Sequence, residues 1–213
     1  MRDIPMFATE LGVASLMLKQ IPYSGCAYIH IRSSALPREF LDECVRFCRS
    51  AGATRIFAAG NACLKDYPHC TDVILMEGPC PKTDFSANLV PVCDKTIHDW
   101  LTIYNEKMQD ISISSHLSPQ DIKELLKDSQ AYFVYEQATL LGIGVVSGNK
   151  IHAIAGCRKG LGVRVFLALC NAISQDTVLV EVATNNLPAV RLYERMGLVK
   201  KEILSSWYEI NLF

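Results

Sequence analysis

The sequence predicts an α/β protein with a mixed central sheet, and three observations support that fold class. Half of its 213 residues are apolar and 20% are charged, a composition that excludes disordered, collagen-like and coiled-coil chains. Short β-branched runs alternate with stretches in which apolar residues recur at helical spacing. One of those runs leads through two glycines, Gly160 and Gly162, into an apolar helix. A chain of this length suits one large domain or two small ones.

The charges are balanced, with 21 Lys and Arg against 22 Asp and Glu, and no block of like charge occurs. This balance argues against a nucleic-acid or anionic-membrane surface, because both need clustered basic residues. The N-terminal stretch has no basic region ahead of a long apolar core, so we expect no signal peptide. No window of about 18 apolar residues predicts a membrane span. Without a secretion signal, the nine cysteines predict reduced thiols and a cytoplasmic location.

The first part of the chain predicts several strands around one helix, over residues 36–51. Pro37 fits the first turn of that helix, apolar side chains recur on one of its faces, and Gly52 fits its end. The other expected elements are a strand over 5–18, an arm of a hairpin with a bend or bulge at Gly12, a turn over 21–25, and strands over 26–31, 55–59 and 73–76.

Residues 78–87 are rich in proline and polar residues, and they predict a linker. A longer set of elements follows it. Ser118, Pro119 and Asp121 match the capping pattern at the start of a helix. The expected strands cover 88–92, 132–135, 139–146, 151–155, 177–182 and 205–212, and the expected helices cover 95–108, a stretch from 118, 160–174 and 188–196.

The element order of the first part, β-β-α-β-β, matches the middle of the second part in shortened form. Ala59-Gly60-Asn61 follows one strand as Ala183-Thr184-Asn185 follows another, and Tyr67 and Tyr193 each lie downstream. This pattern predicts a pseudo-repeat, and chance similarity is the equal alternative. A comparison of the structures of the two parts of the chain decides between them.

The glycine segment from Cys157 to Val163 is the strongest local indication of a ligand site. Two glycines allow a ligand close to the backbone, and the free N–H groups of a helix's first turn bind anions such as pyrophosphate. The segment lacks the Gly-Lys-Ser/Thr of a Walker A loop and the three glycines of a dinucleotide fingerprint. A tight strand-to-helix turn that binds nothing is the equal alternative.

A second string follows a predicted buried strand and reads N-x-x-A-x-x-L-Y-E-x-x-G-L from Asn186 to Leu198. Together with the glycine segment, this string resembles the GNAT N-acetyltransferase superfamily. The resemblance implies the GNAT fold, with a mixed central sheet, for a domain over residues 88–213. Residues 1–80 are then expected to form a small α/β domain, a truncated and degenerate GNAT-like half.

The resemblance also implies a site for acetyl-CoA as co-substrate. The glycine segment would hold the pyrophosphate through backbone amides, while the strand before it and the Asn of the second string would contact the pantetheine arm. The cofactor-binding residues implied in this way are Ile154, Ala155, Lys159, Gly160, Leu161, Gly162, Val163 and Asn186. Tyr193 matches the family tyrosine that protonates the leaving thiolate, which a phenol can do because its pKa exceeds that of a thiol. Two of these residues also have a purely structural interpretation. Tyr193 is then a packed helix residue, and Asn186 is a helix N-cap.

The chain departs from the family at the glycine segment and at the base. Cys157 stands where the family has Gln or Arg, and the segment joining strand and loop is short. Many members carry a Glu base on this strand, where His152 is the nearest match, and its ordinary pKa suits deprotonation of an ammonium. Water as the base, or a strand histidine without a role, is the alternative. Cys157 beside Arg158 and Lys159 also predicts a lowered thiol pKa.

These features predict an enzyme, an N-acetyltransferase in which an amine attacks acetyl-CoA directly, with Tyr193 and His152 as catalytic residues. The alternative is a catalytically impaired module that binds acyl-CoA, or is structural, without turnover. The expected partner is a small-molecule or peptide amine acceptor, with no nucleic acid and no membrane, and a homodimer stays open. No C-x-x-C pair exists, so no metal site is expected.

Overall fold

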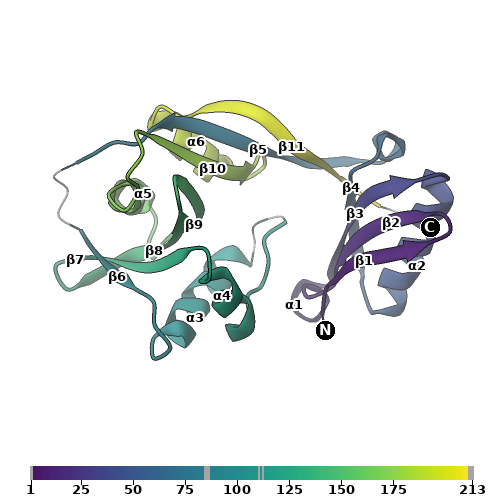
Figure 1. The fold of residues 1–213 in the computed structure, drawn as a ribbon, viewed down its shortest axis with the longest axis horizontal. Coiled ribbons are helices and arrows are strands. Elements are labelled where there is room, and N and C mark those ends of the chain that lie inside the picture. The colour runs from purple at the N-terminus through teal and green to yellow at the C-terminus, as the bar shows by residue number, and fades with distance from the viewer. Residues whose placement is uncertain (1, 84–86, 110, 112, 211–213) are drawn as a thin grey trace. The chain divides into compact units, whose positions relative to one another are not determined.

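The computed structural model describes residues 2–83, 87–109, 111 and 113–210, and within them the chain forms two compact units (Figure 1). Unit 1 comprises the described residues of Met1–Val73, Ser112–His116 and Ile203–Phe213, and unit 2 those of Ile74–Ile111 and Leu117–Glu202. Strands β5 (His69–Pro79) and β11 (Val199–Glu209) each have residues in both units.

Unit 1 is built on a sheet with the strand order β1-β2-β3-β4, followed by the end of β11. Strands β1 to β3 are antiparallel neighbours, whereas β4 runs parallel to β3 after a helical crossover. The end of β11 pairs antiparallel with β4, where Tyr208 lies opposite Ala58. The elements are β1 (Ile4–Thr9), β2 (Gly12–Met17), α1 (Ile21–Ser24), β3 (Cys26–Ser34), α2 (Pro37–Ser50), β4 (Arg55–Ala59) and the 3-10 helix η1 (Ala62–Asp66).

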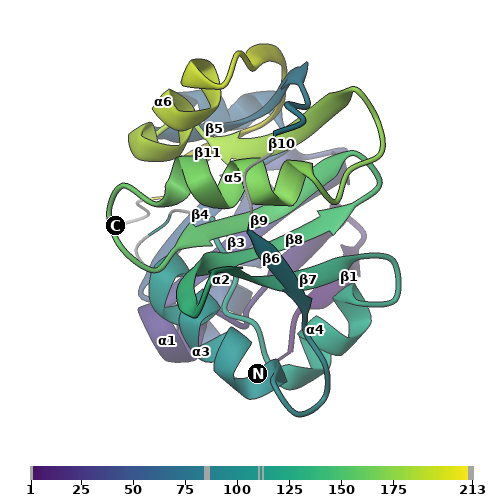
Figure 2. The ribbon, with the colours of Figure 1, turned by 90° about the vertical axis from the view of Figure 1, so that its left-hand side faces the viewer.

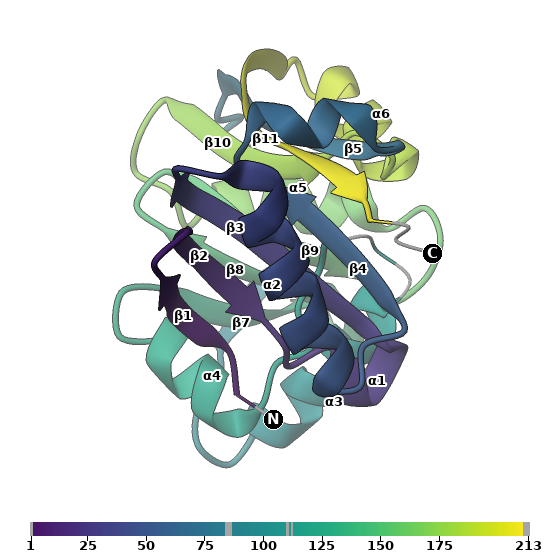
Figure 3. The same cartoon turned by 90° about the vertical axis from the view of Figure 1, so that its right-hand side faces the viewer.

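Helix α2 packs on the β2 and β3 side of this sheet because its apolar residues form one stripe (Figure 3). The buried members of the stripe are Phe40, Leu41, Cys44, Val45 and Cys48. They are the residues that the helical spacing predicts. Burial raises the pKa of the Cys44 and Cys48 thiols to about 12, so both stay protonated and act as small apolar core residues.

Unit 2 is built on strands in the order β5-β10-β9-β8-β7-β6. Strands β6 to β9 are antiparallel neighbours, and β10 runs parallel to β9 after a helical crossover. The elements are β6 (Asn88–Pro91), α3 (Ile97–Met108), α4 (Pro119–Leu125), β7 (Gln130–Glu136), β8 (Thr139–Ser147), β9 (Lys150–Gly156), α5 (Gly162–Cys170), β10 (Thr177–Ala183) and α6 (Leu187–Arg195).

Helices cover both faces of the unit 2 sheet, so alternate residues of its strands belong to different cores. Val134 and Leu141 face the core under α5 and α6, whereas Phe133 and Ile143 face the core under α3 and α4. Figure 2 shows α5 lying across β8 and β9. On the other face Trp100 is fully buried, and its indole Nε1 donates to the Tyr132 carbonyl at 3.1 Å.

The bounds of several helices and strands in the structure differ from the predicted ones. The capping box that opens α4 is present, with Ser118 and Asp121 bonding each other's backbone N–H groups. Helix α5 begins at Gly162 rather than at Gly160, because Gly160 has a φ of +91°, which lies outside the helical region. Strand β5 is longer than expected and includes Gly78 and Pro79 of the predicted linker, whose residues 84–86 lie outside the described part.

The ends of the first and last predicted strands also differ. The segment over 5–18 forms two hairpin arms rather than one, because Glu10 and Leu11 turn the chain and Gly12 begins the second arm. Strand β11 begins earlier than the expected residue 205, and residues 211 and 212 of that expectation lie outside the described part.

The two units share an order of elements. In each unit three consecutive antiparallel strands, β1 to β3 and β7 to β9, lead into a crossover helix and a parallel strand. The helix and parallel strand are α2 and β4 in unit 1 and α5 and β10 in unit 2. A short helix with an asparagine N-cap follows each parallel strand, Asn61 for η1 and Asn186 for α6. This correspondence supports the pseudo-repeat that the sequence predicts.

Candidate functional site

Strand β9 carries a β-bulge at His152. Its antiparallel pairing with β8 runs from Lys150 to Gly156, but the register shifts where Val146 pairs with Ile151 and Val145 pairs with Ala153. His152 is therefore the extra residue, and a bulge of this kind bends a strand away from its regular course.

The bend coincides with a separation of β9 from β10. These parallel strands pair at two positions only, Leu179 with Lys150 and Val180 with Ile151, although both strands continue beyond them. The corresponding strands of unit 1, β3 and β4, pair at five successive positions, along the whole of β4. Unit 2 thus has a parting in its sheet that unit 1 lacks.

The backbone of β9 presents one set of hydrogen-bonding groups to this parting. The Cys157 N–H donates to the Leu141 carbonyl at 2.8 Å, and a Cβ on Gly142 would lie 2.2 Å from the Ala155 oxygen. The backbone groups of Ala155 and Cys157 therefore face β8. Because alternate residues of a strand face opposite edges, the groups of Ile154 face the edge toward β10.

The glycine segment leads from the end of β9 to an uncapped helix N-terminus. Leu161 occupies the N-cap of α5 and makes no side-chain cap hydrogen bond, and no acidic residue lies in the first turn. Arg158, Lys159 and Gly160 are exposed, and nothing lies within 4 Å of the position of a Cβ on Gly160. The first-turn N–H groups of α5, around Val163, therefore open onto a positively charged loop.

Gly162 serves the packing of α5 against α6. A Cβ at this position would lie 2.6 Å from Cδ1 of Leu192. The absent side chain thus allows the start of α5 to approach the helix that carries the second sequence string.

Tyr193 lies in the core between α5 and α6. Its side chain is 4% exposed, and its ring centroid lies 6.0 Å from that of Phe166. No hydrogen bond joins its hydroxyl to any residue that the structure describes. Burial raises the pKa of the phenol well above its usual range, so Tyr193 is a protonated donor at all physiological pH values.

Asn186 is the N-cap of α6, as one of the two alternatives predicts. Its side-chain oxygen accepts a hydrogen bond from the Ala189 N–H at 3.4 Å. The cap uses only the carbonyl end of the amide. The Nδ2 donors of Asn186 take no part in it.

His152 is exposed and lies near an ion pair that the sequence pattern does not predict. The Lys150 ammonium contacts the Glu181 carboxylate at 2.5 Å across the two strands. Partial desolvation lowers the pKa of His152, Lys150 lowers it further, and Glu181 acts in the opposite direction. The sequence showed Glu181 only as a charge on a predicted strand and Lys150 only as a charge just before one, because their pairing depends on strand register.

The expected lowering of the Cys157 pKa is wrong. Desolvation raises the pKa of this thiol, and the nearby Lys107 and Arg158 only oppose that effect. The thiol is therefore protonated at neutral pH, which weakens any role as a nucleophile. Within the described part of the chain, no three His, Cys, Asp or Glu side chains gather as metal ligands.

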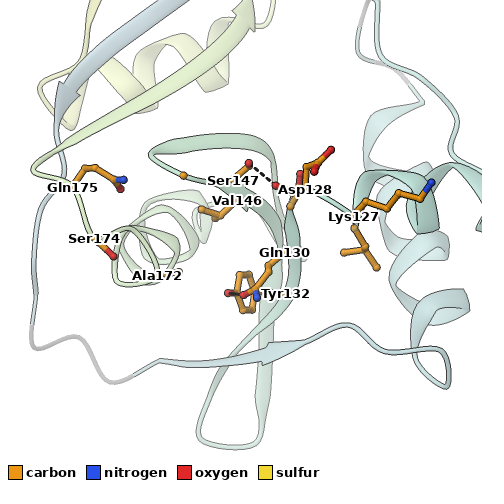
Figure 4. Close-up of a pocket in the computed structure, with 12 residues that line it drawn as sticks. Lys127, Asp128, Gln130, Tyr132, Val146, Ser147, Ala172, Ser174 and Gln175 are labelled. Carbon is orange, nitrogen blue, oxygen red and sulfur yellow. Dashed lines mark hydrogen bonds between the residues drawn. The ribbon is translucent and has the colours of Figure 1, made fainter.

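A cavity of about 450 Å³ lies at the other end of α5, beyond its C-terminus (Figure 4). Two hydrogen bonds join polar groups of its lining: the Tyr132 hydroxyl bonds Gln130, and the Ser147 hydroxyl donates to the Asp128 carbonyl at 2.6 Å. None of the predicted site residues lines it. The parting, glycine segment and Tyr193 lie instead around the N-terminal half of α5.

The strand order, the crossover helix and the parting define unit 2 as an α/β fold of the GNAT type, as the sequence predicts. A family model described as FR47-like protein, which is related to GNAT, matches residues 143–207. By sequence, no curated protein matches the chain. The family match covers the parting, the glycine segment, α5, β10 and α6.

Solved structures agree with this fold. A GCN5-related N-acetyltransferase from Anabaena variabilis has 12% identity and a TM-score of 0.65, over 93% of this chain and 59% of its own. One from Kribbella flavida has 13% identity and a TM-score of 0.55, over 98% and 89%. A tandem GNAT protein from the clavulanic acid biosynthesis pathway has 13% identity and a TM-score of 0.52, over 93% and 78%. The chain thus has the GNAT fold, and its resemblance to that superfamily is confirmed.

Among the described residues, no helix is both long enough and apolar enough to cross a membrane.

Proposed function

We propose that the protein is an acyl-CoA-dependent N-acyltransferase that transfers an acetyl group to an amine. The observation that carries the proposal is the parting of β9 from β10 beside the uncapped N-terminus of α5. A strand edge offers hydrogen bonds to an extended ligand, and a helix N-terminus favours an anion. Acetyl-CoA combines an extended pantetheine arm with a pyrophosphate, so it matches both features in their order along the chain.

The residues of the glycine segment fit the pyrophosphate. Gly160 has open space where a side chain would stand, and the first turn of α5 carries no carboxylate that would repel an anion. Lys159 and its neighbour Arg158 are exposed beside it. In the proposed complex, Lys159 to Val163 hold the phosphates and the Nδ2 group of Asn186 contacts the pantetheine arm. The backbone of Ile154 pairs with that arm, whereas the backbone groups of Ala155, which face β8, do not.

Acetyl-CoA supplies the acyl group as an activated thioester. His152 accepts a proton from the ammonium of the acceptor, because its lowered pKa keeps the imidazole neutral at neutral pH. The backbone N–H of Ile154 polarises the thioester carbonyl from the free edge of β9. Tyr193 donates its phenolic proton to the leaving sulfur, and its raised pKa ensures that the proton is present.

Thermal unfolding with and without acetyl-CoA tests the binding site. A ligand that binds only the native state stabilises it by about 2.7 kcal/mol at a hundredfold excess over Kd. Gly160→Glu is expected to abolish this shift, because it places a carboxylate at the phosphates. Gly148→Glu is the matched control, since Gly148 is also exposed, has a φ of +56°, and has open space around its Cβ position.

Release of free thiol, measured over a panel of small amines and peptides, tests turnover. Acetyl-CoA binding that Gly160→Glu abolishes, together with amine-dependent thiol release, supports the enzyme. Binding without release on any amine favours the alternative of a binding module. A shift that survives in Gly160→Glu removes the glycine segment from the site.

A further inference from the structure

The Lys150–Glu181 ion pair lies at the point where the sheet of unit 2 parts. Lys150 is the first residue of β9, and its ladder partner on β10 is Leu179, two positions before Glu181. The ammonium and carboxylate meet at 2.5 Å, with 26% and 43% of the two side chains exposed. The ion pair therefore lies across the last positions at which the two strands are paired.

Both members of the pair lie on the sheet face opposite to α5 and α6. Ile151, Val180 and Val182 are all buried in the core under those helices. Their chain neighbours Lys150 and Glu181 point the other way, because successive side chains of a strand alternate between faces. The ion pair itself confirms that the two share one face.

His152 is the next residue after the last paired position of β9. Val180 pairs with Ile151, so Glu181 and His152 are the first residues on each strand that the ladder no longer joins. The bulge places His152 at this point, with its side chain exposed. On its other side, β8 offers Val145 and Val146, which carry no titratable group. The charged groups that act on His152 are therefore Lys150, on its own strand, and Glu181, on β10.

We propose that Glu181 is a positioning residue for His152, and that Lys150 holds the Glu181 carboxylate beside the imidazole where β9 and β10 part. This inference rests on the proposed function, in which His152 is the base. An ion pair as exposed as this one contributes little to folding stability. Its main effect is therefore to keep the Glu181 carboxylate next to the His152 imidazole. The carboxylate favours the imidazolium that forms when His152 takes a proton, while the ammonium limits that effect.

NMR titration of the full-length protein tests this arrangement without any need for activity. The His152 signal is assigned by its loss in His152→Gln. Glu181→Gln is expected to lower the titration midpoint of His152 by about half to one pH unit, the effect of a unit charge several ångströms away in a partly solvated site. Lys150→Met is expected to raise the midpoint, because it removes the opposing charge. Glu181→Asp keeps the charge and is expected to stay close to the wild type.

Glu77→Gln is the matched control. Glu77 forms a comparable ion pair in unit 2, with Lys201 at 2.8 Å, but it is not among the groups that act on His152. Its loss is expected to leave the His152 midpoint unchanged. An unchanged midpoint in Glu181→Gln, or an equal change in Glu77→Gln, overturns the inference.

The pH profile of thiol release separates this inference from the proposed function. If both hold, the acid limb of the profile shifts in Glu181→Gln in the same direction and by the same amount as the NMR midpoint. If the midpoint shifts but the wild type releases no thiol with any amine, the placement of Glu181 stands and the proposed enzyme fails. If the midpoint shifts but the acid limb of an active enzyme does not, Glu181 does not act through His152 in catalysis, and the inference fails.

Discussion

Replacing Tyr193 by Phe separates a catalytic hydroxyl from a packed aromatic ring. The ring is 4% exposed and packs on Phe166, and both contacts survive in the variant. The hydroxyl has no hydrogen bond to any described residue, so its removal leaves no partner unsatisfied. We therefore expect the free energy of unfolding to change by less than about 1 kcal/mol, a Tm change within about 2–4 °C for a chain of this size.

Turnover is expected to change far more than stability. General acid catalysis supplies about 10²–10⁴-fold, which corresponds to about 2.7–5.4 kcal/mol of activation free energy. The proton matters only as charge develops on the leaving sulfur, so kcat should fall while the Kd for acetyl-CoA stays nearly constant. The assay is thiol release under saturating acetyl-CoA, beside calorimetric binding of acetyl-CoA.

Tyr67→Phe is the matched control, because Tyr67 is the counterpart of Tyr193 in the predicted repeat and burial also raises its pKa. It lies in unit 1, whose parallel strands do not part, and it is expected to leave turnover unchanged. Full activity in Tyr193→Phe would refute the assignment and leave water or another group as the acid. A loss of stability above about 2 kcal/mol would refute the structural part of the reasoning.

The raised pKa of Tyr193 adds a prediction on alkaline stability: above pH 10 the unfolded phenol ionises while the folded one stays protonated, so stability falls as pH rises, and urea unfolding of Tyr193→Phe should show a shallower fall. Gly142→Ala should cost at least about 2 kcal/mol in the same assay, because its Cβ would lie 2.2 Å from the Ala155 oxygen, and a cost below 0.5 kcal/mol would contradict that close approach. Lys82→Met should cost about 1–2 kcal/mol, because the Lys82 ammonium bonds carbonyls at the C-terminal end of α5, at 3.2 Å for Cys170, and an unchanged Tm would exclude this cap. Asn186→Asp should keep the helix cap and Tm but weaken acetyl-CoA binding, whereas Asn186→Ala should lose about 1 kcal/mol of stability as well; unchanged binding in both would leave Asn186 as a cap only.

The elements that local pattern specifies are predictable from the sequence. The stripe of α2, from Phe40 to Cys48, and the capping box of Ser118 and Asp121 depend on residues within a few positions of each other. Helical spacing and cap chemistry act at that range, so periodicity and composition suffice. The glycine segment and the string from Asn186 to Leu198 are local in the same sense, and they carry the resemblance to the fold that the structure has.

The positions at which the sheet parts were not predictable from the residues alone, because they depend on which strand positions pair. The bulge at His152 appears only when Val145 and Val146 are matched to β9, and the ion pair of Lys150 and Glu181 only when β10 is set in register. The predicted lowering of the Cys157 pKa was wrong for a related reason. Neighbouring cations in the sequence were visible, whereas the desolvation that outweighs them comes from the folded surroundings.

The two units differ at the strand edge where unit 2 has its proposed ligand site. Both units have a crossover helix after their last antiparallel strand, but α2 follows β3 without a glycine segment and its parallel strand pairs throughout. In unit 2 the pairing stops after two positions, which leaves the backbone groups of Ile154 without a strand partner on that edge. Backbone groups left unpaired in a protein are satisfied by water or by a ligand. The fold does not itself require the open edge, since unit 1 has the same order of strands and pairs them throughout. The opening in unit 2 therefore supports the proposal that a ligand pairs with β9.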